Sequence, residues 1–353
     1  MAVIATGFFD GVHLGHRCVI DTLLREARRR SEEAVIITFW PHPRTVLQSD
    51  ARNFRLLTSL EEKKALLMEM GVDRVEVIPF TKEFSSMTAS QYVRHLQESS
   101  GASCLVLGYD TRFGSDQKGP EEIASLDILP CIIAPAVESA GGSVPPIPSA
   151  SPTPPQAVPP LTLPRSRGCS QQAYEMLAAR AEGPGPAGMA RASGAHYRQP
   201  SFSTAGAVSS TLIRKALEGG DVQSANAMLG RAYTLHGVVI SGNQLGRTLG
   251  FPTANMQLYD PLKLVPGRGV YLVEVETLGR RFHGMTNIGV RPTVGNGSNV
   301  TIETNIFDFD EMIYGLDIKL SFILKIRDER RFSSLDELST QLAEDRDDCL
   351  SRL

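Results

Sequence analysis

The chain has 353 residues, enough for two domains, and its 42% hydrophobic and 21% charged residues are typical of a globular protein. Its net charge of −3 gives no reason to expect a nucleic acid or an anionic membrane as the main partner. No apolar run approaches the roughly 20 residues of a membrane span, and no charged-then-apolar leader is present, so we expect a cytoplasmic protein. Five scattered cysteines without a C-x-x-C pair indicate reduced thiols, and neither a zinc site nor a disulfide framework.

The first sixteen residues combine a strand, a tight turn and a helix start. The apolar run Ala2–Thr6 ends at a glycine, and an H-x-G-H pair, His13 and His16, then opens an amphipathic helix predicted over 16–30. A helix N-terminus presents free N–H groups and positive dipole to an anion, and glycines let the anion approach the backbone. The segment therefore predicts a phosphate site, although H-x-G-H alone also fits a plain turn with surface histidines.

The N-terminal third alternates strand-like and helix-like segments, which predicts an α/β fold with a doubly wound parallel sheet and right-handed crossovers. The strand-like runs are short and apolar throughout, as expected for a sheet covered on both faces. The predicted strands are Ala2–Thr6, Ala34–Phe39, Arg74–Pro79, Cys104–Leu107 and Ile128–Ala134, and the predicted helices cover 16–30, 59–70 and 88–98.

Ligands of such sheets bind beyond the carboxyl ends of the strands. Three polar loops are expected at that edge: the turn with the two histidines, the segment Pro41–Arg44 and the segment Gly108–Gly114. Pro41–Pro43 is equally consistent with a simple rigid turn. The convergence of the loops predicts a site, whatever its chemistry.

Residues 138–206 differ in composition from the rest of the chain. They are rich in Pro, Ser, Thr and Ala, and only 171–181 has a helical pattern. Such a composition buries too little apolar surface to offset the entropy of ordering, so we predict a disordered insertion. Gly183–Gly188 matches G-x-G-x-x-G, but prolines fill the variable positions and no strand precedes it, so we reject it as a nucleotide loop.

Three hydroxyl side chains and an arginine share one helical turn after the insertion: Ser209, Ser210, Thr211 and Arg214. A serine N-cap explains one of the hydroxyls but not the set. The guanidinium suits bidentate stabilisation of a phosphoryl group. A second helix is predicted over 221–229.

The C-terminal third is rich in strands with glycine turns, which predicts a small closed antiparallel barrel. The predicted strands cover 233–240, 269–277, 281–288, 300–309 and 316–325, and a final helix lies near 333–350.

Two polar clusters in this third suggest chemistry. Thr253 and Asn255 place oxygen donors on one side of an extended segment, which suits Mg²⁺ carrying a triphosphate. Glu303 shares one face of a predicted strand with Thr301 and Asn305. We expect this face to point into the barrel, where a carboxylate is costly without a function or partner. A glycine-rich hairpin and a surface glutamate are the plain alternatives.

The longer strings resemble the bacterial bifunctional riboflavin kinase/FMN adenylyltransferase family, also called FAD synthetase. G-F-F-D-G-V-H-L-G-H from Gly7, the T-F-W-P-H-P and G-Y-D-T-R-F-G loops and S-S-T-L-I-R from Ser209 resemble its nucleotidyltransferase part. G-R-T-L-G-F-P-T-A-N from Gly246, N-I-G-V-R-P-T and E-T-N-I-F-D-F resemble its riboflavin kinase part. The resemblance implies an FMN adenylyltransferase domain of 1–137 with 207–230, and a riboflavin kinase domain of 231–353.

The implied function is two ATP-dependent steps that need Mg²⁺: phosphorylation of riboflavin to FMN, then adenylylation of FMN to FAD with release of pyrophosphate. Two alternatives stay open, a chain in which only the adenylyltransferase works and a non-catalytic flavin-binding protein. Oligomeric state is not indicated.

The resemblance also implies residue roles. His13, His16 and Arg214 would stabilise adenylyl transfer, and Glu303 would be the general base of the kinase. The implied nucleotide-binding residues are Gly7, Phe9, Asp10, Gly15, Ser209, Ser210, Thr211, Gly246, Thr248, Thr253 and Asn255, of which Thr253 and Asn255 also hold the metal. The implied flavin-binding residues are Asp110, Phe113, Arg291 and Asn305, the last in place of the family's usual histidine.

Overall fold

The computed structural model describes the chain except for residues 48–53, 136–207, 243–244 and 293–297. The predicted insertion at 138–206, with its rejected glycine match, therefore lies outside the described residues. One compact unit contains all the described residues. Within them, no helix is both long and apolar enough to span a membrane, and the four described cysteines are free.

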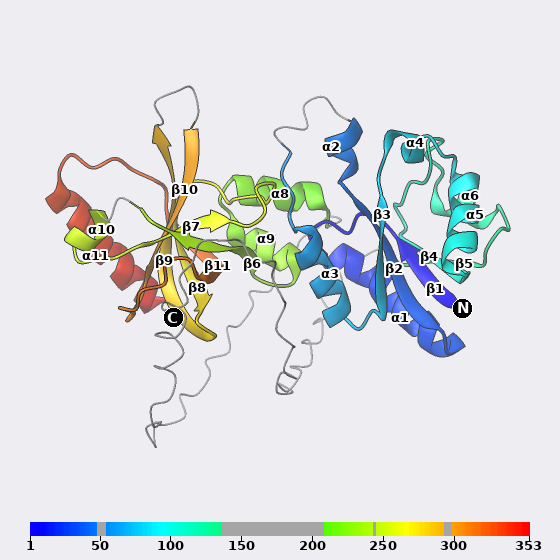
Figure 1. The fold of residues 1–353 in the computed structure, drawn as a ribbon, viewed down its shortest axis with the longest axis horizontal. Coiled ribbons are helices and arrows are strands. Elements are labelled where there is room, and N and C mark those ends of the chain that lie inside the picture. The colour runs from blue at the N-terminus through cyan, green and yellow to red at the C-terminus, as the bar shows by residue number, and fades with distance from the viewer. Residues whose placement is uncertain (48–53, 136–207, 243–244, 293–297) are drawn as a thin grey trace, which may run out of the picture. The chain divides into compact units, whose positions relative to one another are not determined.

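The N-terminal third forms the predicted parallel sheet, with five strands in the order β3-β2-β1-β4-β5 (Figure 1). The last strand is three residues long, which is shorter than predicted. The strands are β1 (Ala2–Thr6), β2 (Glu33–Trp40), β3 (Arg74–Pro79), β4 (Ala102–Leu107) and β5 (Cys131–Ile133).

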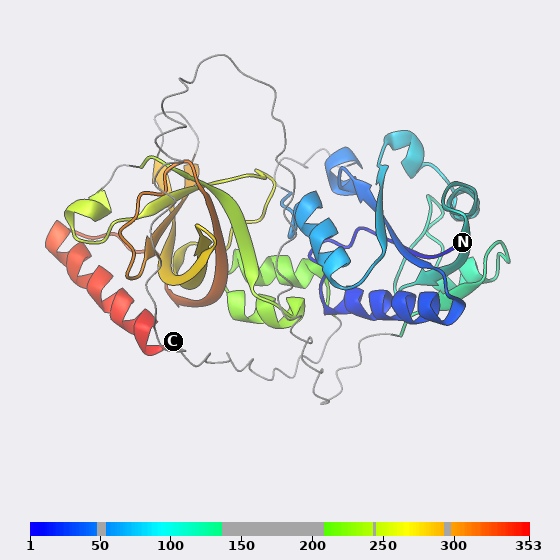
Figure 2. The same ribbon diagram turned by 60° about the horizontal axis from the view of Figure 1, so that its bottom comes forward.

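Helices cover both faces of this sheet, which explains its uniformly apolar strands. Val3 and Ala5 of β1 join a cluster with α1 (Leu14–Arg30) and α3 (Leu60–Glu69), whereas Ala2 and Ile4 join a cluster with α5 (Ala89–Ser100) and α6 (Pro120–Ala124). Figure 2 shows α1 running along one face of the sheet. Because successive side chains of a strand point to opposite faces, both faces must be apolar.

Helix starts follow their capping residues closely. Ser59 and Glu62 form a capping box at α3, and Thr88 and Gln91 form another at α5. Four short helices were not predicted, because four or five residues are too few for a periodic pattern: α2 (Pro43–Leu47), α4 (Lys82–Ser85), α6 (Pro120–Ala124) and α10 (Leu245–Thr248). The two predicted helices before the barrel are confirmed as α8 (Ser210–Glu218) and α9 (Val222–Leu229).

The C-terminal third forms the predicted antiparallel barrel, closed by six strands in the order β10-β7-β6-β11-β8-β9. The sequence analysis missed β7, which has five residues and only one buried side chain, Met256. The elements are β6 (Tyr233–Ile240), β7 (Ala254–Leu258), β8 (Gly269–Thr277), β9 (Arg280–Pro292), β10 (Ser298–Ile306), β11 (Asp317–Arg327) and the predicted final helix α11 (Leu335–Ser351).

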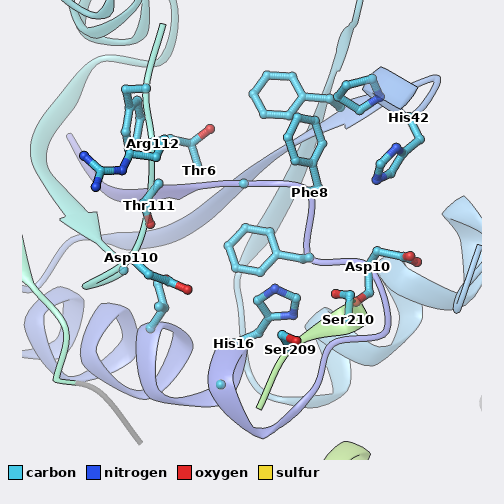
Figure 3. A pocket seen from close by; sticks show the side chains of 18 of the residues that line it. Thr6, Phe8, Asp10, His16, His42, Asp110, Thr111, Arg112, Ser209 and Ser210 are labelled. Atoms are coloured by element: carbon cyan, nitrogen blue, oxygen red, sulfur yellow. The ribbon is translucent and has the colours of Figure 1, made fainter. Parts of the chain in front are cut away.

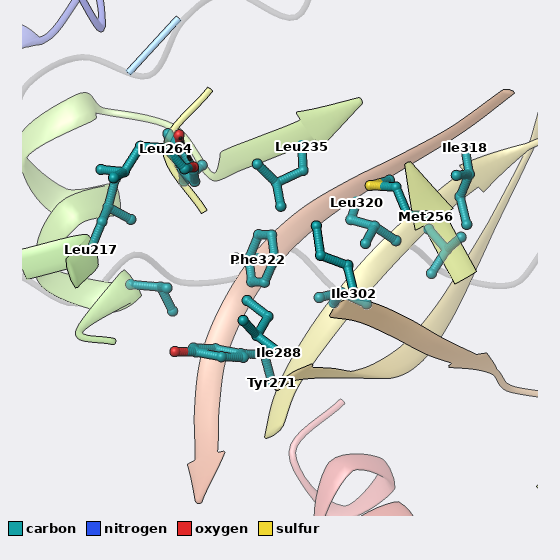
Figure 4. Close-up of a cluster of buried hydrophobic side chains, with 14 of the residues drawn as sticks. Leu217, Leu235, Met256, Leu264, Tyr271, Ile288, Ile302, Ile318, Leu320 and Phe322 are labelled. Carbon is teal, nitrogen blue, oxygen red and sulfur yellow. Dashed lines mark hydrogen bonds between the residues drawn. The ribbon is translucent and has the colours of Figure 1, made fainter. Parts of the chain in front are cut away.

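The barrel interior is a single apolar cluster to which every strand contributes (Figure 4). Tyr271 and Phe322 of this cluster meet edge to face, with ring centroids 5.4 Å apart. Leu217 of α8 belongs to the same cluster, so the helix after the insertion is anchored on the barrel.

The alternation of side chains along β10 shows which face of the strand carries Glu303. Ile302 and Ile306 belong to the interior cluster, and Thr304 is buried against Thr286. Glu303 must then point to the outer face of the barrel wall, so the prediction that it faces inward is wrong. The apolar members of the strand decide the register, because one step of alternation exchanges the two faces.

Candidate active site

A cavity of about 650 Å³ opens beyond the carboxyl ends of β1 and β4, where the strand order reverses (Figure 3). The loops after β1, β2 and β4 and the start of α8 line it, as the three-loop prediction required. It brings together all the residues predicted for the nucleotidyltransferase part: Gly7, Phe9, Asp10, His13, Gly15, His16, Asp110, Phe113, Ser209, Ser210, Thr211 and Arg214.

His13 is the N-cap of α1, a position more often held by Ser, Thr, Asp or Asn. Its Nδ1 accepts the backbone N–H of His16 at 3.3 Å, and the two imidazoles stack with centroids 3.7 Å apart. Because Nδ1 accepts, the ring is neutral and carries its proton on Nε2. A methyl group on Gly15 would lie 3.0 Å from the His13 ring, so a small residue suits this turn.

Burial keeps both imidazoles neutral. It lowers the pKa of His13 to about 4, with Asp10 opposing the shift and Arg231 and Arg214 adding to it. Burial also lowers the pKa of His16 well below its usual value. Nδ1 of His16 is buried without a hydrogen-bond partner among the described residues. Leaving such an atom unpaired costs about 1–3 kcal/mol, and a bound phosphoryl group could supply the partner.

The neutral His13 at the start of α1 makes the free energy of unfolding depend on pH. Since the pKa of His13 falls from 6.5 to about 4 on folding, the folded protein binds fewer protons than the unfolded chain between these values. The contribution of His13 to stability is therefore complete above about pH 6.5 and is lost as the pH falls towards 4. His13→Asn keeps a capping acceptor that does not titrate, so its melting temperature should fall less than the wild-type value between pH 7 and pH 5. Equal falls would contradict a buried neutral imidazole.

Asp10 and Arg214 form an ion pair at the cavity wall, although they are 204 positions apart. The Asp10 carboxylate also accepts the backbone N–H groups of Leu57 and Thr58 at 3.1 Å. Arg214 donates from Nε to the Arg55 carbonyl at 3.1 Å. The predicted catalytic arginine is thus at the site, fixed by the carboxylate that the sequence analysis assigned to the nucleotide.

The three hydroxyls at the start of α8 have separate positions. Ser209 caps the helix by accepting the N–H of Leu212, and Ser210 donates to the Asp10 carbonyl at 2.9 Å. Thr211 lines the cavity on the same turn. The Ser210 contact joins the start of α8 to the turn after β1.

One wall of the cavity is aromatic, and the sequence analysis did not identify most of it. Phe8 and Phe39 have ring centroids 5.1 Å apart, and Phe113 is buried beside Tyr92 at 5.9 Å. The sequence offered one signal for these residues: several of them lie at the carboxyl ends of predicted strands, where ligands bind. The wall comprises Phe8, Phe39, Phe80, Phe84, Tyr92 and Phe113.

Lys63 of α3 is a second residue that the sequence analysis missed. Its ammonium donates to the Phe8 carbonyl at 3.0 Å and to Oγ1 of Thr38 at 2.9 Å, directly behind the turn that lines the cavity. Burial lowers the pKa of Lys63 to about 8. In the sequence it stands in an ordinary run of charged helix residues, which gives no sign of burial.

A second cluster lies on the outer face of the barrel. Glu303 on β10 is directly opposite Asn255 on β7 and Asn287 on β9. Directly opposed side chains in antiparallel strands have Cβ atoms about 4.5–5.5 Å apart. A half-buried carboxylate therefore shares one surface with two amides.

Asn305 ties this cluster to the turn before β7. Its Nδ2 donates to the Pro252 carbonyl at 2.8 Å, next to Thr253. A methyl group on Gly246 would collide with the Phe251 carbonyl and lie 3.4 Å from Cγ2 of Thr253, so the α10 turn folds closely onto the same segment. Gly246, Thr253, Asn255, Glu303 and Asn305 are thus brought together. Thr248 lies in α10, and the side chain of Arg291 on β9 is outside the described part.

The doubly wound sheet, with a helix start at its cavity, and the barrel, with its carboxylate and amides, fit the class of enzymes that transfer phosphate-containing groups. The FAD synthetase family model matches residues 1–127, and the riboflavin kinase model matches residues 229–353. The chain belongs to the bifunctional riboflavin kinase/FMN adenylyltransferase family. The predicted family and the order of its two parts are confirmed.

Relatives and a solved structure cover nearly the whole chain. The bifunctional riboflavin kinase/FMN adenylyltransferase of Bacillus subtilis is 30% identical over 99% of this chain and 92% of its own length. The enzyme of that name from Escherichia coli K12 is 31% identical over 97% and 90%. A crystal structure described as a macrolide-efflux protein from Streptococcus pneumoniae has a TM-score of 0.75, at 28% identity over 98% of this chain and 92% of that one.

Proposed function

We propose that the protein phosphorylates riboflavin at the outer face of the barrel and adenylylates the product, FMN, in the 650 Å³ cavity. The proposed adenylyltransferase domain comprises 1–137 and 207–230, and the proposed kinase domain comprises 231–353. Two observations carry the proposal. The stacked, neutral imidazoles at the start of α1 include an unpartnered buried nitrogen, and Glu303 lies opposite Asn255.

In the cavity, an FMN phosphate oxygen attacks the α-phosphorus of ATP, the bond to the β-phosphate oxygen breaks, and pyrophosphate leaves. No protein nucleophile is needed. The imidazoles of His13 and His16 and the N–H groups at the start of α1 donate to the phosphoryl oxygens. Arg214, paired with Asp10, offers a guanidinium at the cavity wall. The aromatic wall, and Asp110 on the same loop as Phe113, suit a planar flavin ring.

At the barrel, the 5′-hydroxyl of riboflavin attacks the γ-phosphorus of a second ATP, and ADP leaves. Glu303 accepts the hydroxyl proton as the new bond forms. Thr253 and Asn255 offer oxygens of the kind that Mg²⁺ binds, and no group of three or more His, Cys, Asp or Glu suited to a metal occurs among the described residues. Mg²⁺ held there with the nucleotide would neutralise phosphate charge.

A single incubation tests the proposal. The purified protein is mixed with riboflavin, ATP and Mg²⁺, and the flavins are separated. FMN and FAD together support both activities. A parallel incubation contains FMN in place of riboflavin. FAD formed only in that second incubation would show that the adenylyltransferase alone is active, and bound but unchanged riboflavin in the first would indicate a carrier.

Asn305 gives a more specific prediction for the kinase. Since its amide holds the Pro252 carbonyl, Asn305→Ala should lower riboflavin phosphorylation about tenfold, the effect of losing roughly 1.4 kcal/mol of positioning. Asn305→His restores a donor and should stay near wild type. A marked rise in turnover with histidine would contradict a purely positioning role and indicate participation in proton transfer.

A further inference from the structure

The turn between β1 and α1 is held by a residue from the far half of the chain. Arg231, between α9 and β6, donates to the Gly11 carbonyl at 2.7 Å and to the Val12 carbonyl at 3.1 Å. These are the two carbonyls that precede His13. Arg231 falls within the segment that matches the riboflavin kinase model, yet it contacts the N-terminal site.

The carbonyls that Arg231 binds belong to a strained turn. Gly11 has φ of 84° and Val12 has φ of 40°. Positive φ is exceptional for a β-branched residue, so it persists only where the surroundings impose it. A methyl group on Gly11 would also lie 2.8 Å from Cδ1 of Leu57. The guanidinium therefore stabilises a conformation that the turn would not keep alone.

Arg231 also contributes charge behind the histidine pair. It acts on both imidazoles together with the other charged groups near them, which are Asp10 and Arg214 for His13, and Lys63 for His16. A cation in this place raises the positive potential at the start of α1, where phosphates bind.

A second anchor from the same half of the chain supports the turn indirectly. The loop that holds Asp10 pairs with the segment after β7, because Leu56 donates to the Leu262 carbonyl at 2.7 Å and Leu264 donates to the Leu56 carbonyl at 2.8 Å. Lys263 adds an ammonium contact to the Leu57 carbonyl at 2.9 Å. The turn after β1 is thus fixed at both sides by residues beyond 230.

We infer that Arg231 is a positioning residue for adenylyl transfer: it sets the Gly11–Val12 turn so that His13, His16 and the start of α1 meet the substrate phosphates. The kinase half of the chain thereby completes the adenylyltransferase site. The inference rests on the proposed assignment of adenylyl transfer to this cavity.

The test uses the full-length protein with Arg231→Met and Arg231→Lys. Adenylylation of supplied FMN and phosphorylation of riboflavin are measured separately, each as kcat and KM. Arg231→Met should lower kcat for adenylylation about 10- to 100-fold, because small displacements of a positioned site have effects of that size, while phosphorylation stays unchanged. Arg231→Lys keeps the charge and one donor and should recover part of the rate. Arg281→Met, at an exposed arginine of β9, is the matched control.

The pH profile of adenylylation gives a second readout, which reports the charge of Arg231 beside His13. Removing the positive charge of Arg231 raises the pKa of His13, because a nearby cation disfavours the protonated imidazole. The acid limb of adenylylation should move to higher pH in Arg231→Met and should stay in place in Arg231→Lys.

Wild-type adenylylation in Arg231→Met would overturn the inference. So would an equal loss of both activities with a lower melting temperature, which would show a general role in folding. Loss of phosphorylation with adenylylation intact would instead overturn the assignment of the two activities to their sites.

Discussion

Replacing Glu303 by glutamine is expected to lower riboflavin phosphorylation by about 10²–10⁴-fold, the range for a positioned general base. Glutamine keeps the size and one oxygen of the side chain but cannot accept the hydroxyl proton. Affinities for riboflavin and MgATP should therefore change much less than turnover. Single-turnover formation of FMN at saturating substrates measures the chemical step directly.

Two controls accompany this variant. Adenylylation of supplied FMN should be unchanged in Glu303→Gln, because the carboxylate lies on the outer face of the barrel and outside the cavity lining. Glu311→Gln removes an exposed carboxylate that pairs with Arg280 and should leave both activities intact. Wild-type turnover in Glu303→Gln would contradict the assignment of Glu303 as general base and favour a structural role for its carboxylate.

Replacing His16 by alanine is expected to abolish FAD formation from FMN and to leave riboflavin phosphorylation nearly intact. The substitution removes the half-buried imidazole, which carries the unpartnered Nδ1 and stacks on His13. Loss of one preorganised donor alone lowers turnover about 10²–10³-fold, and the stacked neighbour should also lose its position.

The matched control for His16→Ala is His95→Ala, a histidine of α5 that does not line the cavity. This variant should keep both activities. Near-normal melting temperatures would show that the variants are folded. Loss of both activities in a folded His16→Ala protein would contradict the assignment of the reactions to separate sites.

The parallel sheet and the residues around the cavity could be predicted because they depend on local patterns. Strand and helix periods alternate in the first third, and ligands of such sheets bind at one edge. The start of α1 and the start of α8 each carry recognisable polar residues. Their meeting, through Ser210 and the Asp10 carbonyl, follows from the fold and not from either segment alone.

The barrel was predicted less completely, for two physical reasons. β7 is short, and its one buried side chain, Met256, has polar neighbours on either side, so the strand has only a weak hydrophobic pattern. Glu303 was placed on the wrong face because alternation along a strand defines two faces but does not say which one is interior. In the structure Ile302 and Ile306 belong to the interior cluster, so Glu303 lies on the other face.

The residues that support the cavity from behind had no sequence signal. Lys63 stands in a run of charged helix residues, and Arg231 stands between Gly230 and Ala232. Their partners, Phe8 and the Gly11–Val12 turn, are 55 and 219–220 positions away. A buried cation that binds backbone carbonyls depends on tertiary contacts, which a periodic pattern does not record.

The contact between Ser210 and the Asp10 carbonyl has a consequence for how the family can vary. It fixes one end of the connection between β5 and α8, and the hydrogen bond from Ala134 to the Leu107 carbonyl, 2.7 Å long, fixes the other. The entropy of closing a loop grows only with the logarithm of its length, about 0.6 kcal/mol for each doubling. Insertions of very different size can therefore accumulate at this place during evolution while the catalytic geometry on either side is preserved.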